Sequence, residues 1–324
     1  MQVRSRWIWT LLLAFPAALD AQRSYENLQV LPADIARSDL NEIMLGNLRG
    51  LGLPRLAGEG CLFCHEGDLE RPRTEWDYAS DAKPMKAKAR VMMAMVAAIN
   101  EEYLPRLDNR LDMGSRVTCT TCHAGRTDPR PLPTVVWEAY EAGGVDSAAM
   151  RYRALRTRYF GSEAYDFRVG VLPAMAMRMA DAGAIEDAIA LAALNVEVNP
   201  GVPAAERAWV GFRLERTIDQ DGVQTALQEL DDLATSVSDR ALSPGLLDAL
   251  AWRLMRSDRE PQAIEIIETN YVRFPDDYGP NESMAFVLND LGETDRAIAI
   301  LERWLERHPD HARARRLIIN MRGG

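Results

Sequence analysis

The amino-acid sequence predicts a mainly helical protein in two parts, a small N-terminal module with few strands and a C-terminal α-solenoid of helix–turn–helix repeats. Three observations lead to this fold class. Apolar residues recur at helical spacing along much of the 324-residue chain. Two copies of a Cys-x-x-Cys-His motif occur in the N-terminal part, and segments near the C-terminus repeat at a constant interval.

The composition is that of a folded globular protein with an acidic surface. Hydrophobic residues make up 47% and charged residues 27% of the chain, and the formal net charge is -10 with a pI near 5.1. An acidic chain without a basic run repels a phosphate backbone, so we expect no nucleic-acid partner. A basic protein partner is expected instead.

The N-terminus has the pattern of a secretory signal peptide. Arg4 and Arg6 precede an apolar stretch at positions 7–19, and the small residue Ala21 follows as a cleavage point. This stretch is shorter than the roughly 17–25 residues of a spanning helix, which disfavours an uncleaved membrane anchor. The sequence therefore predicts a signal peptide at 1–21 and a periplasmic or otherwise exported protein, either soluble or peripherally associated with a membrane.

Both Cys-x-x-Cys-His motifs have the residues that covalent haem attachment requires. Two thiols separated by two residues form thioethers with the haem vinyl groups, and the histidine after the second cysteine ligates the iron. All four cysteines of the chain belong to these motifs, which leaves none for disulfides. The sequence thus predicts two covalently bound haem c groups, attached by Cys61, Cys64, Cys119 and Cys122 and ligated by His65 and His123.

Two other uses of paired cysteines fit less well. The cysteine pairs of a four-cysteine zinc site lie about 15–20 residues apart and need no histidine directly after them. Here the two pairs begin 58 residues apart, at Cys61 and Cys119. A thioredoxin-like dithiol follows a strand in a βαβ pattern, and no such pattern precedes either motif.

Methionine is the expected sixth ligand of each iron. The chain has only four histidines, and the two outside the motifs, His308 and His311, fall in the C-terminal repeats. A thioether is a natural axial ligand and favours the reduced iron. A predicted helix around 38–50, with Ser38 as a candidate N-cap, carries Met44 on its apolar stripe. A second predicted helix precedes the second motif, and spacing alone does not choose among its Met92, Met93 and Met95.

The segments DLNEIM, EGCLFCHEG, ARVMMAM and VTCTTCH follow one another in this chain, with Asn100 between the last two. In identity and spacing they resemble the N-terminal, two-haem half of the tetrahaem cytochrome c subunit of photosynthetic reaction centres. In that family a helix methionine ahead of the haem motif is the distal ligand. The resemblance, which covers residues 28–128, implies Met44 as distal ligand of the first haem and Met92 as that of the second, with Met95 as the alternative.

The chain departs from that family in three respects. It has two haem motifs where the family has four. The stretch LDNRLDMGSR has no histidine that could ligate another haem, and no cysteine for lipid attachment lies near the end of the signal sequence. These departures argue against a role as a reaction-centre subunit and leave electron transfer as the expected function.

The C-terminal half repeats with a 34-residue interval. Ala263 and Pro275 recur as Ala297 and Pro309, and the same spacing of alanine and proline occurs at Ala188. A weaker unit surrounds Ala226. This is the tetratricopeptide period, so we expect stacked helix pairs in which His308 occupies the position of Phe274 and has a structural or surface role rather than ligating iron.

Together these patterns predict a signal peptide at 1–21, a dihaem domain at 22–135, a helical connector at 136–165 and a repeat domain at 166–324. The expected function is that of an electron carrier rather than an enzyme, with the repeats binding a basic or membrane-bound redox partner or a second copy of the chain. Two alternatives remain open. A dihaem peroxidase would need an open iron position beside an acid–base residue, and a haem redox sensor would use the repeats for regulated binding.

Overall fold

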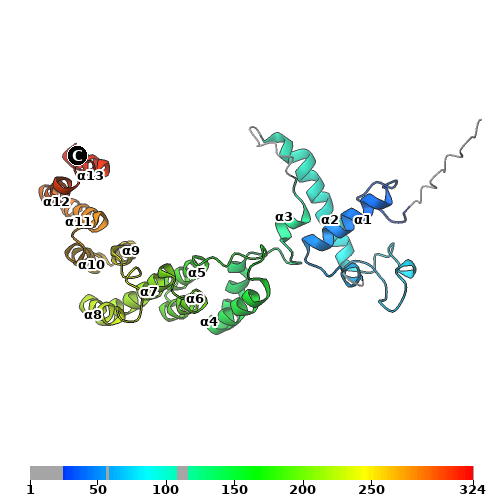
Figure 1. Cartoon of the computed structure of the whole chain (residues 1–324), viewed down its shortest axis with the longest axis horizontal. Coiled ribbons are helices and arrows are strands. Elements are labelled where there is room, and N and C mark those ends of the chain that lie inside the picture. Colours follow the sequence, from blue (N-terminus) through cyan, green and yellow to red (C-terminus); the bar gives the residue numbers. More distant parts are fainter. Residues whose placement is uncertain (1–24, 56–57, 108–115, 324) are drawn as a thin grey trace, which may run out of the picture. The chain divides into compact units, whose positions relative to one another are not determined.

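The computed structural model describes residues 25–55, 58–107 and 116–323. The predicted signal peptide at 1–21 therefore lies outside the described residues. Contacts divide the chain into unit 1, which ends at Pro129, and unit 2, which begins at Arg130. In the described ranges all regular elements are helices, so the few strands expected in the N-terminal module are not found there (Figure 1).

Unit 1 is built from three α-helices and several short turns of other helix types. The α-helices are α1 (Arg37–Gly50), α2 (Pro84–Ala98) and α3 (Cys119–His123). The 3-10 helices are η1 (Glu59–Phe63), η2 (Arg73–Glu75) and η4 (Leu104–Arg106), and η3 (Ile99–Tyr103) is a π-helical turn that continues α2. Both haem motifs therefore lie in short helical turns between or after the longer helices.

Helix α1 begins earlier than its sequence suggests. Ala36, not Ser38, is the N-cap residue, and the Ser38 hydroxyl bonds the Asp39 carboxylate at 3.0 Å instead of capping the helix. The prediction of Ser38 as N-cap was wrong because the extended backbone that a cap needs falls at Ala36. The helix ends at Gly50, as expected, and Gly52 follows with a φ of 64°.

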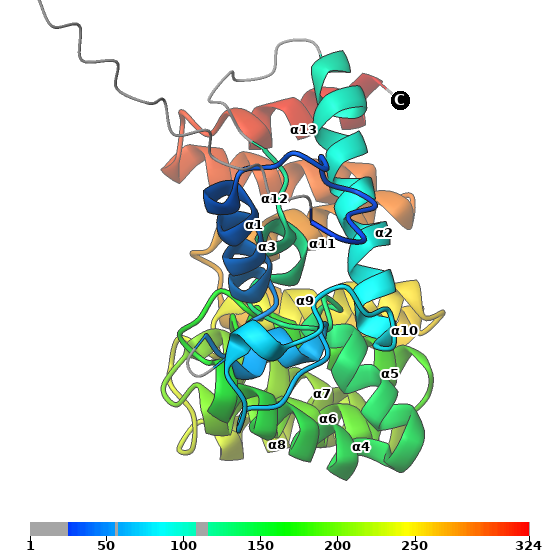
Figure 2. The ribbon, with the colours of Figure 1, turned by 90° about the vertical axis from the view of Figure 1, so that its right-hand side faces the viewer.

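Unit 2 is a succession of helices joined by short turns (Figures 1 and 2). Helix α5 packs against α6, α9 against α10, and α11 against α12. The long helix α4 is interrupted at Gly143 and Gly144, where the backbone leaves helical geometry. The helices are α4 (Leu132–Tyr159), α5 (Val171–Asp181), α6 (Ile185–Val198), α7 (Pro203–Asp221), α8 (Val223–Leu233), α9 (Pro244–Arg256), α10 (Glu260–Arg273), α11 (Tyr278–Asp290), α12 (Thr294–Arg307) and α13 (Ala312–Gly323).

The repeated alanines of unit 2 are buried among its helices. All four are at most 1% exposed, which shows that a larger side chain would have no room there. They occupy equivalent places near the start of α6, α8, α10 and α12: Ala188, Ala226, Ala263 and Ala297. The sequence period therefore predicted the second helix of each pair.

Two buried asparagines form the same hydrogen bond in different repeats. Asn195 Nδ2 donates to the Val169 carbonyl at 3.0 Å, and Asn270 Nδ2 donates to the Pro244 carbonyl at 3.1 Å. Each amide fixes the second helix of a pair to the backbone around the start of the first helix. Both asparagines are 1% exposed, so these bonds are shielded from water.

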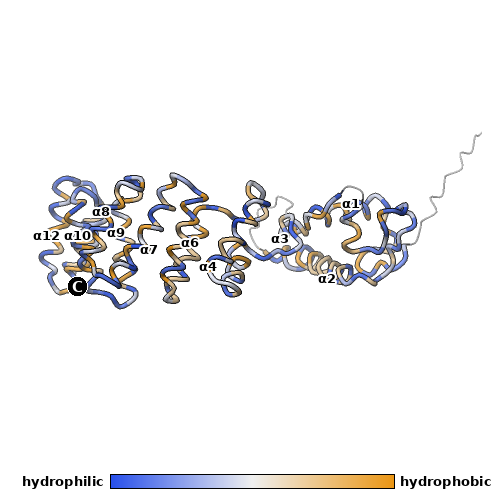
Figure 3. The backbone as a smooth tube through the Cα atoms, turned by 90° about the horizontal axis from the view of Figure 1, so that it is seen from below, coloured by the Kyte–Doolittle hydropathy of each residue, from blue (hydrophilic) through white to orange (hydrophobic). Residues whose placement is uncertain are grey.

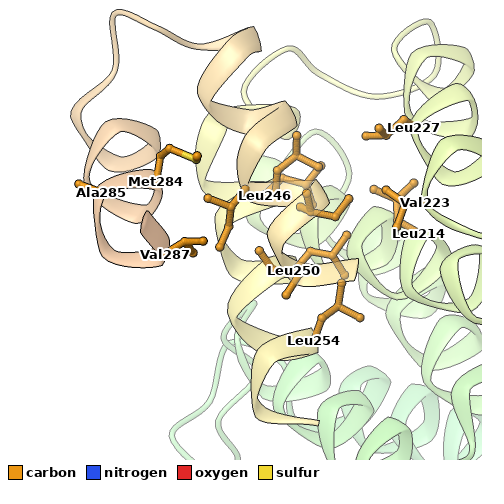
Figure 4. Close-up of a cluster of buried hydrophobic side chains, with 14 of the residues drawn as sticks. Leu214, Val223, Leu227, Leu246, Leu250, Leu254, Met284, Ala285 and Val287 are labelled. Carbon is orange, nitrogen blue, oxygen red and sulfur yellow. The ribbon is translucent and has the colours of Figure 1, made fainter. Parts of the chain in front are cut away.

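The core of unit 2 consists of two clusters of buried apolar side chains. One joins α4 to α7, and the other runs from α7 to α13. Figure 4 shows part of the second cluster, in which Leu246, Leu250 and Leu254 lie along one face of α9. Figure 3 shows hydrophobic and hydrophilic residues alternating along the coils of these helices, as amphipathic packing requires.

His308 and Phe274 are both C-cap residues, of α12 and α10, with nearly the same backbone angles. The His308 ring stacks on Trp304 with centroids 4.1 Å apart, and His311 lies 4.0 Å from the ring of Tyr278. Both histidines thus make aromatic contacts after the end of α12, with His308 exposed and His311 half-buried. These contacts agree with the structural role expected of His308.

Candidate haem-binding site

The first motif folds as a tight turn supported by α1. The backbone N–H of His65 donates to the Cys61 carbonyl at 2.9 Å, so both residues belong to one turn. Gly60 donates its N–H to the Pro54 carbonyl at 3.1 Å, and a Cβ at Gly60 would lie 2.3 Å from that oxygen. Only glycine therefore lets the motif approach the end of α1 this closely.

His65 is half-buried and lies against the ring of Tyr78. Its ring meets Tyr78 edge-on with centroids 5.2 Å apart, and its Nδ1 is buried without a hydrogen-bond partner among the described residues. Burial lowers the pKa of His65, the charge of Lys86 lowers it further, and the Tyr78 backbone carbonyl opposes the shift. The lowered pKa favours the neutral imidazole, the form that ligates a metal.

The second motif is the short helix α3 with a reciprocal cap. The side chain of Thr118 accepts from the backbone at Thr121, and Thr121 returns a bond to the Thr118 N–H at 3.0 Å. The turn ends at Ala124, which has a φ of 47°. The reciprocal cap fixes the start of this five-residue helix.

The His123 ring is oriented by a backbone carbonyl. Its Nδ1 lies 2.8 Å from the Arg126 carbonyl oxygen, so the proton is assigned to Nδ1, which donates to that carbonyl. This tautomer leaves the Nε2 lone pair for a metal ion, and such a bond is the usual second partner of a metal-ligating histidine. The buried Arg126 in turn donates from Nε to the His123 carbonyl at 3.3 Å.

The C-terminal end of α1 contacts the second motif as well as the first. Gly125 N–H donates to the Gly50 carbonyl at 2.9 Å, and a Cβ at Gly50 would lie 2.7 Å from the Cβ of Cys119. A Cβ at Gly52 would lie 1.9 Å from the Gly125 carbonyl oxygen. Helix α1 and α3 are thus neighbours, as Figure 2 also shows.

Asn47 connects this end of α1 to both α2 and α3. The Cys119 thiol lies 3.2 Å from Asn47 Oδ1, and Asn47 Nδ2 lies 3.7 Å from the sulfur of Met93. Asn47 follows Met44 by three residues, so the two side chains share a helix face. The sequence reasoning missed Asn47, although its position in the DLNEIM helix was the available signal.

The candidate methionines differ in their surroundings. Met44 is half-buried on α1, whereas Met92 and Met95 on α2 are 43% and 45% exposed. Met93 is half-buried and contacts Asn47. The structure therefore brings Met93 toward α1 and Cys119, and it leaves Met92 and Met95 on an exposed apolar face of α2.

Three observations show that the residues of both motifs and of α2 fit covalently bound haem. His123 is fixed in the metal-binding tautomer, and none of the four cysteines is in a disulfide. Helix α2 is hydrophobic along much of its length (Figure 3). Its side chains Val91, Met92 and Met95 are exposed. An apolar macrocycle would cover such a face. Within the described ranges, no three Cys, His, Asp or Glu side chains gather to share a metal ion, as a zinc cluster would require.

Comparison with known families agrees with these observations. Residues 13–166 match the photosynthetic reaction centre cytochrome C subunit family. The match includes both Cys-x-x-Cys-His motifs and the two methionine helices, and the resemblance predicted from the motifs is thereby confirmed. A cytochrome c family implies covalently bound haem c and electron transfer. Residues 281–321 match the tetratricopeptide repeat, which implies binding to other proteins.

Individual relatives are more distant. Cytochrome c-554 of Chloroflexus aurantiacus is 36% identical over 66 residues, which are 20% of this chain and 14% of that protein. The chain therefore spans a small part of that relative. Similar solved structures include MamA, with 17% identity and a TM-score of 0.26 over 55% of this chain and 97% of that one. A thermophilic tetratricopeptide repeat protein of Thermus thermophilus has 13% identity and a TM-score of 0.28 over 59% of this chain and 96% of that one.

No helix in the described ranges combines the length and the apolar character that crossing a bilayer demands. Members of the cytochrome subunit family are typically exported or membrane-associated. The chain matches this family in the region that contains both motifs.

Proposed function

We propose that this chain is an exported dihaem c-type cytochrome that transfers electrons to or from a protein bound by its repeats. Cys61 and Cys64 would attach the first haem, with His65 and Met44 as axial ligands. Cys119 and Cys122 would attach the second, with His123 and Met92 as ligands and Met95 as the alternative. A bound haem supplies one-electron chemistry at its iron.

The observation that carries the proposal is the environment of His123. The Arg126 carbonyl holds the imidazole in the tautomer that leaves Nε2 available for iron. The Thr118–Thr121 cap fixes the turn that carries both Cys119 and His123. A surface histidine without such a partner would rotate freely, so this arrangement favours ligation.

Two filled axial positions suit electron transfer rather than substrate chemistry. A histidine and a methionine from this chain would hold each iron without leaving an open position, so a change of oxidation state would need little rearrangement. The chain then contributes burial, hydrogen bonds and nearby charge, which set the reduction potentials. A peroxidase would instead need one methionine to be absent from its iron.

Unit 2 would bind the redox partner or a second copy of the chain. Residues 130–324 contain 22 arginines, no lysine and 31 aspartates and glutamates, so the unit is strongly acidic. Tetratricopeptide repeats bind proteins on extended surfaces. A basic redox partner is the complement of this charge.

The test is to purify the exported full chain, count covalent haems by mass and record oxidised and reduced spectra. We expect two haems, low-spin spectra and the sulfur-to-iron charge-transfer band of methionine ligation. Cell fractionation should place the protein outside the cytoplasm, with the residues before the cleavage point removed. One haem, or a high-spin iron that turns over peroxide, would contradict the proposal.

A further inference from the structure

All three lysines of the chain lie together at the start of α2, beside the first haem motif. They are Lys83, Lys86 and Lys88, whereas the other 35 basic residues are arginines spread along the sequence. Lys83 is the N-cap residue of α2, and its Nζ donates to the Leu62 carbonyl at 2.5 Å. Leu62 lies between the two cysteines of the first motif, so Lys83 holds that turn directly.

Lys86 occupies a cage of backbone carbonyls from the loop at 78–80. Its Nζ donates to Tyr78 O at 2.9 Å, Ala79 O at 2.8 Å and Ser80 O at 2.7 Å, and the residue is only 8% exposed. An ammonium group has three donors around one atom, which matches three converging oxygens. A planar guanidinium cannot place its donors in this way, which explains a lysine in a chain that otherwise uses arginine.

The cage links Lys86 to His65 through Tyr78. The Tyr78 ring meets the His65 ring edge-on at 5.2 Å, and the Tyr78 carbonyl that lies near the imidazole accepts a bond from Lys86. Lys86 thus fixes the loop that carries the ring against His65. Without the ammonium, three carbonyls of this loop would lose a common partner.

The charge of this cluster is positive. Asp81 lies 3.2 Å from Lys86 and 2.9 Å from Arg90, so a single carboxylate faces two cations. Lys86 and Arg90 have side chains 10% and 14% exposed, whereas that of Asp81 is 46% exposed. Water therefore screens the carboxylate more than the cations, and a net positive field remains at His65.

We propose that Lys86 sets the reduction potential of the first haem, by fixing a buried positive charge beside His65 and by positioning Tyr78 against its ring. This inference rests on the proposed function, in which Cys61 and Cys64 attach that haem. A nearby positive charge disfavours the more positive ferric state and so raises the reduction potential. Lys86 is a positioning residue, since it acts through Tyr78 and through space rather than by touching iron.

The first experiment compares Lys86→Met with Lys88→Met in the full exported chain. Lys88 lies on the same helix and is exposed, so its loss changes the net charge equally without disturbing the cage. Redox titration followed by visible spectroscopy should resolve two one-electron steps. We expect Lys86→Met to shift the reduction equilibrium of the first haem about tenfold toward the oxidised form, while the second step and the Lys88→Met variant stay unchanged.

Two further variants separate charge from packing. Asp81→Asn removes the exposed counter-charge, so it should move the first step in the opposite direction, toward the reduced form. Lys86→Arg keeps the charge but cannot fill the cage, so it should lower the melting temperature while preserving more of the potential than Lys86→Met. A Cys119→Ser, Cys122→Ser double variant, which retains only the first haem, shows which of the two reduction steps belongs to that haem.

These outcomes distinguish the inference from the proposed function. If mass shows no haem on Cys61 and Cys64 in the unaltered protein, the proposed function fails. If both haems are present but Lys86→Met shifts both steps equally or neither, the inference is overturned. If Lys86→Met does not fold, the Asp81→Asn variant decides. An unchanged reduction potential of the first haem in Asp81→Asn overturns the inference.

Discussion

The side chain of Asn100 forms two hydrogen bonds with the backbone of Val117. Asn100 Nδ2 donates to the Val117 carbonyl, and the Val117 N–H donates to Asn100 Oδ1, both at 2.8 Å. Asn100 Nδ2 also donates to the Val96 carbonyl at 2.9 Å. The end of α2 is thereby fastened to the residue just ahead of the second haem motif.

Replacing Asn100 by Leu should loosen the second motif. The change removes both bonds to Val117 and leaves its backbone groups without these partners, at a cost of about 1–3 kcal/mol. We expect a lower denaturation midpoint and incomplete haem attachment at Cys119 and Cys122, measured by mass. Asn41→Leu, at an exposed position of α1, is the control and should leave both quantities unchanged. Equal behaviour of the two variants would refute the role of Asn100.

Gly50 and Gly46 offer a matched pair on the same helix. A Cβ at Gly50 would meet the Cβ of Cys119 at 2.7 Å, whereas a Cβ at Gly46 meets nothing within 4 Å. Gly50→Ala should therefore destabilise unit 1 by about 1–3 kcal/mol through overpacking. Gly46→Ala should stabilise α1 by about 0.5–1 kcal/mol, since alanine is the better helix former. Chemical denaturation followed by circular dichroism measures both, and the idea fails if their signs agree.

The distal ligand of the second haem can be decided by single alanine variants. The family resemblance implies Met92, while Met93 is the methionine whose sulfur contacts Asn47 beside Cys119. We expect Met92→Ala to abolish one sulfur-to-iron charge-transfer band in the oxidised spectrum and Met93→Ala to keep both. The reverse result would assign the ligand to Met93, and a loss only in Met95→Ala would assign it to Met95.

Glu215 anchors a buried ion-pair network in unit 2. Its carboxylate bonds Arg253 and Arg259, each at 2.5 Å, and the side chain is 5% exposed. In Glu215→Ala, Arg253 keeps Asp181 and Arg259 keeps Asp219 as carboxylate partners, so we expect a loss of about 1–3 kcal/mol in the free energy of unfolding. Thermal unfolding of the exposed control Glu268→Ala should differ little from that of the unaltered protein. Equal unfolding temperatures for the two variants would show that Asp181 and Asp219 suffice to stabilise these arginines.

Much of the fold could be predicted from the types and spacing of neighbouring residues. The spacing of Ala263 and Ala297 predicted equivalent helices because a residue that packs at every helix contact must stay small. Both Cys-x-x-Cys-His motifs could be recognised because their residue types occupy fixed, adjacent positions, whereas the ligand roles of the methionines stay predictions. The start of α1 was misplaced, since Ser38 is a good cap by residue type but the preceding backbone turns at Ala36.

Contacts between segments that are distant in the sequence could not be predicted from local patterns. Lys86 lies on an amphipathic helix, where a lysine is normally expected at the surface, and only the loop 78–80 folding over it creates the carbonyl cage. Asn47 likewise meets Cys119 across 72 residues of sequence. No periodicity encodes contacts of this kind.

The sequence by itself determined the two haem motifs, the helical repeats and the acidic charge, because each depends on residue type and spacing along the chain. Only the tertiary structure decided that α1 contacts both motifs, that the Arg126 carbonyl orients His123, and that a buried ammonium lies beside His65. These features depend on burial and on backbone carbonyl groups, which every residue has. They therefore cannot be predicted from the identity of the residues alone. Their positions follow from how the chain packs.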